Sequence, residues 1–558
     1  MMDLKQRPFY LTDEQIDWVK KTMEDMTLEE KVGQLFCPIC VSTHPEYLKN
    51  EIMRFHVGGM LIKTSPSKDV RNALDYMQSS SKIPMLCTAN LEFGSTGMLE
   101  DGTFFAQQMA IGASGKDLNA YRLGLVSCKE AAAVGCNVAF APVSDLDLNW
   151  RNPIVNVRSY GDNADVTLAM CKAYMQGAKE AGVEVTVKHF PGDGVDEVDQ
   201  HLLTSVNTLS CDEWDQTYGK IYQGMIDADA KLVMIGHIAL PSYQKALNPE
   251  HPDQLIPATL SPQLLEGLLR DKLGFEGLIM TDATPMVGFT SAMKRADAVP
   301  LSIAAGCDVF LFNKSLEEDY RYMMDGVKNG VLTMERLEEA VTRILALKAS
   351  MNLHTSKLVP DESALEVVGC DEHRAWAKEC ADESITLVKD TAQHLPLDAA
   401  KTKRMLLEVI GGFPSDERVK QGMMKRMEQE GFEVTLYTPE DFDNYTFGVE
   451  PFTDAYDIVL YLGNVETVSN ETSSRLTWHT LWGNGDNLPW FVKEVPVVFA
   501  SLGNPYHLVD VPMIQTYINC YANSDTIMDE LVEKLMGRSA FKGQSPTDPF
   551  LGKEYLRY

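Results

Sequence analysis

The 558-residue sequence has no surplus of basic residues. Its 50 lysines and arginines stand against 80 aspartates and glutamates, which gives a formal net charge of −30. A protein of this charge has no basic excess to neutralise the phosphates of nucleic acids, and anionic membrane surfaces repel it. We therefore expect neither nucleic acid nor a membrane among its partners.

Long apolar runs and regular cysteine spacing are also missing. No apolar run approaches the ~18 residues of a membrane span, and the start of the chain shows no signal peptide. The 11 cysteines are odd in number and scattered, as in a reduced, cytoplasmic protein. The CxxC at residues 37–40 has no second pair, so we interpret it as part of a buried strand and expect no metal there.

Short apolar runs alternate with helical patterns through the first 315 residues. Eight of these runs are predicted strands: residues 32–40, 58–64, 83–92, 134–147, 183–190, 231–240, 274–283 and 307–314. Apolar strands separated by helices indicate a parallel sheet that is buried on both faces. Eight such units over about 300 residues favour a (β/α)8 barrel over an open sheet.

The length of the chain predicts more than one domain. An amphipathic helix over 330–353 ends the barrel, so we assign residues 1–352 to a catalytic barrel domain and the polar residues 353–375 to a linker. Five more strand patterns follow, which predict a smaller α/β/α sandwich over residues 376–558. The expected fold class is therefore α/β throughout.

Polar side chains follow most of the predicted barrel strands. They are Asn90, Glu92, Asp145, Asp147, Lys188, His189, His237 and Asp282. Reactive groups of such barrels lie at the carboxyl ends of the strands, so the joint pattern predicts a site although any one residue could belong to an ordinary polar loop. Asp282 follows the buried run GLIM, and the nearby Pro285 argues against a simple helix-capping role.

The segment KHFPGDGVDEVDQH, residues 188–201, carries the densest group of titratable side chains. Asp199 and His201 lie two apart, so the carboxylate can hold the imidazole, which titrates near neutral pH and can act as general acid and base. Metal binding by His189, His201 and His237 with a carboxylate is the alternative. No HxH or HExxH spacing supports that alternative, and we expect no metal and no cofactor.

Three motifs together resemble glycoside hydrolase family 3. They are KHFPGDG followed by DQH, RSYGDN at 158–163, and LGFEGLIMTDATPM at 273–286. The resemblance is closest to the two-domain β-N-acetylglucosaminidase branch. Residues 20–350 resemble the barrel of that family, and ESITLVKD and SLGNPYHL resemble its second domain.

The resemblance implies roles for individual residues. Asp282 matches the nucleophile that forms a covalent glycosyl-enzyme, and Asp199 with His201 matches the acid/base dyad that replaces the usual Glu in this branch. The residues expected to bind the sugar are Asn90, Arg158, Lys188, His189 and His237. Lysine and arginine are donors only and suit the lone pairs of hydroxyl groups.

Two positions depart from the family pattern. Asp193 stands where the family has a second His, and Asn90 stands where it has a sugar-binding Asp. An Asn lacks the charge that strengthens a hydrogen bond, so binding is expected to be weaker or directed at a different hydroxyl pattern. Asp193 adds negative charge near the dyad, which favours the charged form of His201.

The function expected from the resemblance is retaining hydrolysis of terminal β-linked N-acetylglucosamine from small glycosides, in cell-wall recycling by analogy. A β-glucosidase or β-xylosidase of the same family, and a non-catalytic sugar-binding protein, are the alternatives. A β-N-acetylglucosaminide phosphorylase is a further one, because a neutral imidazole repels an anionic acceptor less than a carboxylate does. We expect phosphate to be an acceptor secondary to water.

Overall fold

The arrangement of the chain follows from its apolar strands, most of which belong to a parallel barrel or to a six-stranded sheet. The computed structural model describes residues 3–250, 255–356, 359–438, 448–478 and 487–558. Two compact units result. The first consists of Met1–Phe105, Ala120–Asn152 and Asn163–Arg374, and the second of Ala106–Asn119, Pro153–Asp162 and Ala375–Tyr558. Two short segments that we expected inside residues 1–352 thus group with the second unit.

The first unit contains a closed ring of parallel strands. Their bounds are β1 (Phe36–Cys37), β2 (Ile39–Cys40), β3 (Gly59–Ile62), β4 (Leu86–Ala89), β5 (Val138–Ala139), β6 (Glu184–Phe190), β8 (Leu232–Ile235), β10 (Leu278–Thr281) and β11 (Phe310–Leu311). Seven of these described strands pair in the order β10-β8-β6-β5-β4-β3-β2. β1 and β2 are separated only by Pro38, which has no N–H for the ladder. β1 pairs with β11, and a bridge between Met280 and Val309 links β10 to the start of β11. The predicted (β/α)8 barrel is confirmed.

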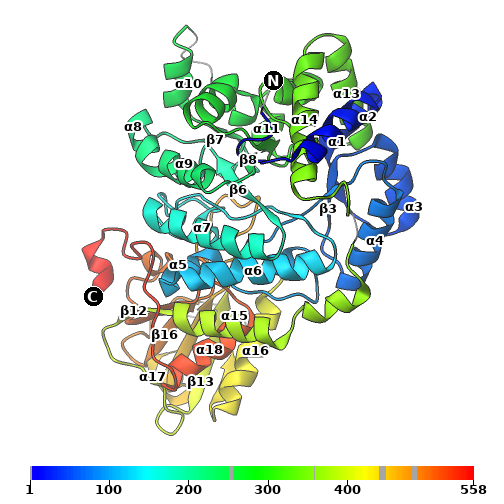
Figure 1. Ribbon diagram of the computed structural model, residues 1–558. Coiled ribbons are helices and arrows are strands. Elements are labelled where there is room, and N and C mark those ends of the chain that lie inside the picture. The colour runs from blue at the N-terminus through cyan, green and yellow to red at the C-terminus, as the bar shows by residue number, and fades with distance from the viewer. Residues whose placement is uncertain (1–2, 251–254, 357–358, 439–447, 479–486) are drawn as a thin grey trace. The chain divides into compact units, whose positions relative to one another are not determined.

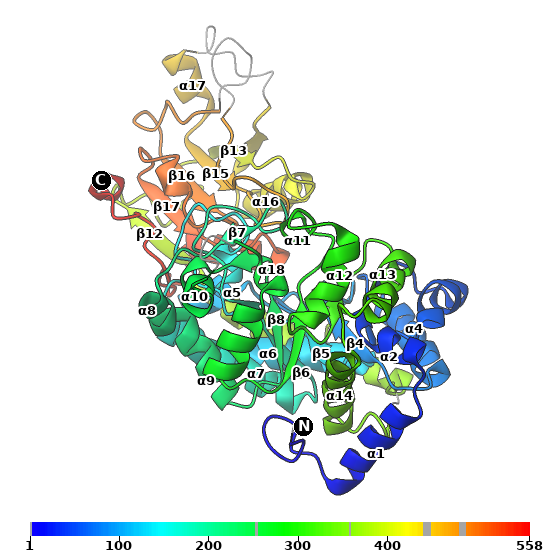
Figure 2. The same ribbon diagram turned by 90° about the horizontal axis from the view of Figure 1, so that it is seen from above.

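Helices surround these strands (Figure 2). Those between or after successive strands are α4 (Ser67–Ser80), α6 (Asp117–Ala133), α7 (Ala164–Glu180), α9 (Lys220–Asp227), η7 (Gln263–Lys272), α12 (Arg295–Ala304), α13 (Leu316–Lys328) and α14 (Met334–Ser350). The others in this unit are α1 (Asp13–Glu24), α2 (Leu28–Gln34), α3 (Pro45–Tyr47), α8 (Cys211–Trp214), α10 (Pro241–Leu247) and α11 (Val287–Thr290). In α14, Leu337, Val341 and Ile344 are fully buried at helical spacing, as the amphipathic pattern predicts.

A second, shorter parallel pair lies near the carboxyl ends of the barrel strands. β7 (Ser205–Val206) pairs with β9 (Ile238–Ala239). We expected residues 231–240 to form one strand, but Gly236 and His237 separate β8 from β9. The pair fixes the segment after His201 to the segment after His237, and so helps to position the end of the barrel where polar residues gather.

The second unit is built on a six-stranded sheet in the order β12-β17-β16-β15-β13-β14. The strands are β12 (Thr386–Asp390), β13 (Arg404–Ile410), β14 (Glu433–Leu436), β15 (Ile458–Gly463), β16 (Val497–Ser501) and β17 (Thr516–Asn519). Only β12 is antiparallel among these described strands. The five predicted strands are confirmed, and β12 is an additional one. The helices of this unit are α5 (Gln108–Ser114), α15 (Asp371–Ser384), α16 (Asp416–Gln429), α17 (Val449–Ala455) and α18 (Asp525–Leu535) (Figure 1).

Aromatic side chains on neighbouring strands stabilise the second sheet. Tyr461, Phe499 and Tyr517 lie in register across β15, β16 and β17, and their rings stack at centroid distances of 5.9 and 5.4 Å. All three are buried in one apolar cluster. Such cross-strand aromatic pairs contribute packing energy beyond simple burial. Among the described residues, no helix combines the length and apolar character needed to cross a bilayer.

Candidate active site

Asp282 stands at the carboxyl end of β10, immediately after the last strand residue. Its backbone N–H donates to the carbonyl of Ile235 at the end of β8 (2.8 Å), and its Oδ1 accepts the N–H of Ala283 (2.7 Å). The side chain is only 13% exposed. Burial raises the pKa of this carboxyl, but the electrostatic influence of the nearby His189, His237 and His201 side chains outweighs burial and lowers it overall. Asp282 is therefore ionised, which is the state that a nucleophile requires.

His189 lies between two carboxylates. Its Nδ1–H donates to Oδ2 of Asp145 (2.6 Å), and its Nε2 is 3.8 Å from Oδ2 of Asp282. The backbone N–H of His189 also donates to Asp145 (3.2 Å). Because Asp145 is fully buried and fixes both the ring and the backbone, the Nε2 edge of His189 is directed toward Asp282.

Lys188 forms a buried ion pair at the same rim. Its Nζ is 2.5 Å from Oε1 of Glu92, and both side chains are less than 10% exposed. The two residues come from the ends of different strands, β6 for Lys188 and the loop after β4 for Glu92. Because both charges are buried, removing either partner would leave the other without compensation.

Asp199 and His201 form a hydrogen-bonded pair in the loop after β6. Nδ1–H of His201 donates to Oδ1 of Asp199 (2.7 Å), and so does the backbone N–H of His201 (2.8 Å). Asp199 is fully buried, whereas the His201 side chain is 27% exposed. The carboxylate therefore fixes the tautomer and leaves Nε2 of His201 accessible for proton transfer.

The loop that carries the Asp199–His201 pair is tied to the segment after Asp282. The N–H groups of Val287 and Gly288 donate to the carbonyls of His201 (3.0 Å) and Gln200 (3.1 Å). The hydroxyl of Thr204 donates to the carbonyl of Gly288 (3.0 Å). These hydrogen bonds connect the loop of the Asp199–His201 pair directly to the segment that follows Asp282.

His237 has protein partners at both ring nitrogens. Its Nε2–H donates to the carbonyl of Ala283, and its Nδ1 accepts from the hydroxyl of Thr259, both at 3.0 Å. Burial lowers the pKa of His237 to about 4, so the ring is neutral. In this arrangement His237 supports the residue next to Asp282, and its direct contact with a sugar stays a prediction.

The other two predicted sugar-binding residues lie in different units. Asn90 directly follows β4 at the barrel rim and is partly exposed. Arg158 ends the short helix η4 (Asn156–Arg158) in the second unit, where its guanidinium donates to the carbonyl of Ile154 (3.2 Å). The assignment of both residues to sugar binding stays a prediction.

Glu92 and Asp145 were predicted to lie at the rim of the barrel, but no role was assigned to them. Their partners Lys188 and His189 are more than 40 positions away, so only the tertiary structure reveals the pairs. Their position directly after strands was the available signal. The described residues contain no group of three or more His, Cys, Asp or Glu arranged to hold a metal ion.

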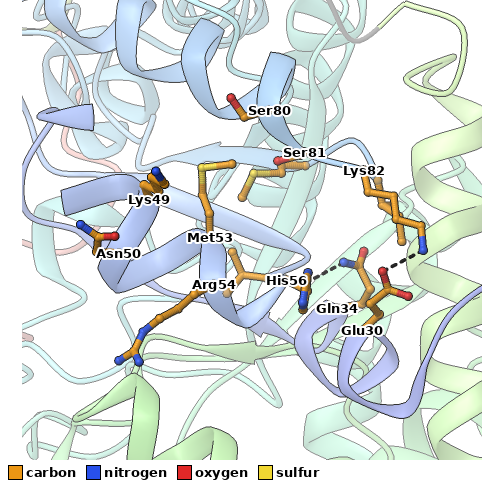
Figure 3. A pocket seen from close by; sticks show the side chains of 13 residues that line it. Glu30, Gln34, Lys49, Asn50, Met53, Arg54, His56, Ser80, Ser81 and Lys82 are labelled. Atoms are coloured by element: carbon orange, nitrogen blue, oxygen red, sulfur yellow. Dashed lines mark hydrogen bonds and ion pairs between the residues drawn. The ribbon is translucent and has the colours of Figure 1, made fainter. Parts of the chain in front are cut away.

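A cavity of about 480 Å³ lies elsewhere on the barrel (Figure 3). Its lining includes Gln34, Val57 and Met85, which stand just before β1, β3 and β4. At its edge Lys82 donates to Glu30 (2.8 Å). The cavity is thus at the amino ends of the strands, opposite the end that carries Asp282, and we do not assign it to the active site.

Comparison with known proteins identifies the family. Residues 27–347 match the glycosyl hydrolase family 3 N terminal domain. The chain belongs to glycoside hydrolase family 3. It is 43% identical to a β-N-acetylglucosaminidase/β-glucosidase of Cellulomonas fimi over 99% of both chains, and 30% identical to β-hexosaminidase A of Pseudoalteromonas piscicida over 66% of each.

A solved structure is similar over nearly the whole length of the chain. The β-glucoside phosphorylase BglX bound to 2FGlc has a TM-score of 0.94 and 41% identity, and the match covers 98% of this chain and 99% of that one. The chain is therefore an enzyme of glycoside hydrolase family 3. The rim of its barrel carries the ionised Asp282 with the neighbouring His189, the Lys188–Glu92 ion pair and the Asp199–His201 pair.

Proposed function

We propose that this family 3 enzyme removes terminal β-linked N-acetylglucosamine from small glycosides with retention of configuration, and accepts β-linked glucose as well. The observation that carries the proposal is the combination of an ionised Asp282 with a second, proton-carrying group, His201 held by Asp199. The similarity to an enzyme of Cellulomonas fimi named for both sugars supports the dual specificity.

In the first step of the proposed mechanism, the carboxylate of Asp282 attacks the anomeric carbon. The bond to the leaving-group oxygen breaks, and protonated His201 gives that oxygen its Nε2 proton. Asp199 stabilises the imidazolium and holds it in one orientation. The sugar is then covalently attached to Asp282, and His201 is neutral.

In the second step, neutral His201 takes a proton from an acceptor that attacks the same carbon from the side of the departed group. The ester bond to Asp282 breaks and its carboxylate is regenerated. Two inversions give net retention. We infer that Lys188, fixed by Glu92, and His189, fixed by Asp145, orient hydroxyl groups of the sugar during both steps.

Phosphate is a second candidate acceptor in place of water. The group beside the incoming acceptor is an imidazole, which is neutral in the glycosyl-enzyme, whereas a carboxylate would repel an anion at ~4 Å by about 1–4 kcal/mol. Similarity to a β-glucoside phosphorylase at 41% identity supports this candidate. Asp199 and Asp193 keep some negative charge nearby, so we expect phosphorolysis to be secondary to hydrolysis.

Two other functions make different demands on the site. A β-xylosidase is a further possibility within the family, and the resemblance of the Asp199–His201 pair to the β-N-acetylglucosaminidase branch favours the amino sugar instead. A non-catalytic sugar-binding protein would need neither a nucleophile nor an acid/base group. The lowered pKa of Asp282 and the hydrogen bond between His201 and Asp199 support a catalytic role instead.

We also propose a cytoplasmic location and a role in cell-wall recycling. All 11 cysteines are free and nine of them are buried, as expected for a protein of a reducing compartment. The recycling role rests on analogy with enzymes that act on the same amino sugar. Cell fractionation tests the location.

One assay tests the central proposal. Initial rates are measured on 4-nitrophenyl β-glycosides of N-acetylglucosamine, glucose and xylose, with and without millimolar phosphate, and the sugar products are identified. We expect the N-acetylglucosaminide to be cleaved fastest, the free β-sugar to form first, and some sugar 1-phosphate to appear with phosphate. Preference for the xyloside would contradict the substrate assignment. An unchanged rate with no sugar phosphate would exclude phosphate as an acceptor.

A further inference from the structure

Asp193 is a buried carboxylate next to the candidate active site, at a position where the family pattern has a His. It lies in the loop after β6 and is 2% exposed. Three N–H groups donate to its side chain: those of Gly194 (2.7 Å) and the Asn152 amide (3.2 Å) to Oδ1, and that of the Gln200 amide (3.3 Å) to Oδ2. All three partners are donors, so they match an ionised carboxylate and not a protonated one.

The backbone of Asp193 is tied to the nucleophile side of the site. Its N–H donates to Oδ1 of Asp145 (2.9 Å), the carboxylate that also holds His189 against Asp282. Its carbonyl accepts from the hydroxyl of Tyr218 (2.5 Å). Neither bond involves the Asp193 side chain, so a substitution there leaves both in place.

The side chain of Asp193 is tied to the dyad side through Gln200. That residue stands between Asp199 and His201 in the chain. Its amide N–H donates to Asp193, and its Oε1 accepts the backbone N–H of His237 (2.7 Å). Both ends of the Gln200 amide are thus engaged, and a flip of this amide would break both bonds.

We propose that Asp193 is a positioning residue, whose ionised side chain holds Gln200 and thereby the Asp199–His201 pair in register with Asp282. The inference rests on the proposed role of that pair as acid and base. Two donors contact Oδ1 and only Gln200 contacts Oδ2, so an Asn at position 193 is expected to keep its oxygen at the Oδ1 position and to turn its NH2 group toward the NH2 of Gln200. The link to the dyad is then lost, whereas the backbone link to Asp145 is kept.

The charged surroundings of Asp193 make this link sensitive to pH. The titratable groups that face it are Asp145 after β5, His189 in β6, Asp199 in its own loop and Tyr218 in the helical segment η5 (Asp215–Gly219). Burial, followed by the negative charge of Asp145, raises the pKa of Asp193 to about 7. Acidification below neutral pH therefore protonates Asp193 and removes the acceptor that Gln200 needs.

The experiment compares Asp193→Asn, Gln200→Ala, the double variant, His201→Ala and the control Asp196→Asn. Asp196 is in the same loop, and its Oδ2 accepts the N–H of Val206 instead of contacting Gln200. The kcat/KM value is measured on an alkyl β-glycoside, whose leaving group needs a proton, and on the 4-nitrophenyl glycoside, which needs little. Hydrogen exchange of residues 199–203 is followed in the same proteins.

We expect Asp193→Asn to lower kcat/KM about 10–100-fold on the alkyl glycoside and less than about 5-fold on the nitrophenyl glycoside. We expect the acidic limb of the wild-type profile on the alkyl glycoside to lie near pH 7, from the titration of Asp193, and to move to lower pH in Asp193→Asn. Exchange in residues 199–203 should accelerate, and the double variant should be no worse than the more severe single one. Asp196→Asn should behave as wild type.

The other outcomes distinguish the positioning role of Asp193 from the acid/base role of His201. If exchange accelerates but His201→Ala itself shows no dependence on the leaving group, the positioning link stands and the acid/base assignment is wrong. If His201→Ala shows that dependence and Asp193→Asn does not, or if exchange is unchanged, the positioning role of Asp193 is overturned. Additive losses in the double variant would also overturn it, because they would show that Asp193 does not act through Gln200.

Discussion

Nε2 of His189 lies 3.8 Å from Oδ2 of Asp282, while Nδ1 of the same ring is held by Asp145 at 2.6 Å. The ring therefore cannot rotate away from Asp282 without losing its bond to a buried carboxylate. Burial raises the pKa of Asp282, and the electrostatic influence of His189 is the largest of the effects that lower it. The candidate nucleophile therefore stays ionised although it is buried.

The first prediction concerns Asp282 itself. Asp282→Asn removes the attacking oxygen charge, so no glycosyl-enzyme can form and turnover should fall by at least about 10⁴-fold on every substrate. Incubation with an activated 2-deoxy-2-fluoro glycoside should add one sugar to the wild-type protein, and peptide mass spectrometry should place it on Asp282. An adduct in the variant, or one that maps to another carboxylate, would show that the nucleophile is a different residue.

The second prediction separates the acid from the nucleophile. His201→Ala should lower kcat/KM about 100-fold or more on an alkyl glycoside and about 10-fold or less on the nitrophenyl glycoside, because nitrophenolate leaves without protonation. Its kcat and KM on the nitrophenyl substrate should fall together, since the glycosyl-enzyme accumulates when no base activates the acceptor. Equal losses on both substrates would contradict the role of His201.

The third prediction concerns the partner of His201. Asp199→Asn keeps the size of the side chain but no longer stabilises the imidazolium or selects the Nδ1–H tautomer. We expect KM to change little and kcat/KM on the alkyl glycoside to fall, with a smaller loss than in His201→Ala. The pH–rate profiles of the two proteins test this. A profile identical to that of the wild type would mean that Asp199 is only a structural residue.

The sequence predicted the barrel well because its strands are local patterns. The apolar runs were long enough to predict every barrel strand, and the amphipathic helix predicted over residues 330–353 is present as α14 (Met334–Ser350). The break between β8 and β9 was missed because apolar residues flank Gly236–His237 on both sides. Likewise, the grouping of Ala106–Asn119 and Pro153–Asp162 with the second unit depends on contacts distant in sequence.

In the candidate site, too, contacts between residues close in sequence could be predicted and contacts between distant residues could not. The Asp199–His201 contact spans two residues, so spacing alone indicated it, and Asp282 was marked by its place after a buried strand. The Asp145–His189 and Glu92–Lys188 pairs join different strands, and their partners are set by barrel geometry. Gln200 gave no signal, because a single amide in a loop acquires its role only from the groups on both sides of it.

The fourth prediction tests the buried Lys188–Glu92 pair. Glu92→Gln leaves the Lys188 ammonium buried without its partner charge, which should destabilise the fold by about 3–5 kcal/mol. The double variant Lys188→Met/Glu92→Leu should regain most of that stability and still bind sugar poorly. Urea unfolding and KM are the measurements.

A matched control for that pair is available on the same strand. Glu184 at the start of β6 pairs with Lys231 (2.5 Å), but both side chains are partly exposed, at 25% and 17%. Glu184→Gln should therefore cost less than about 1 kcal/mol and leave KM unchanged. If Glu92→Gln lowered the free energy of unfolding no more than Glu184→Gln does, a group other than Glu92 would have to compensate the charge of Lys188.

The last prediction follows from the raised pKa of Asp193 in the folded protein. The pKa of this carboxyl is about 7 in the folded protein and near its ordinary value of 3.8 in the unfolded chain. Between these two values the folded state binds more protons, so the contribution of Asp193 to stability is full below pH 3.8 and is lost as the pH rises through 7. Asp193→Asn cannot titrate and should gain stability relative to the wild type between pH 5 and 8. At ~1.4 kcal/mol per pKa unit, the whole titration is worth on the order of 4 kcal/mol, of which about 3 kcal/mol falls between pH 5 and 8.

Thermal and urea unfolding across this range measure the effect as a difference between two proteins. His237, whose pKa is lowered to about 4 by burial, destabilises the fold as the pH falls below its unfolded value, but it does so equally in both proteins and cancels. Asp196→Asn in the same loop should run parallel to the wild type, because its carboxylate is only half-buried. A constant difference between Asp193→Asn and the wild type from pH 5 to 8 would mean that Asp193 does not titrate there. A variant that is more stable at pH 8 yet slower on alkyl glycosides would show that the buried charge is maintained for catalysis at the expense of stability.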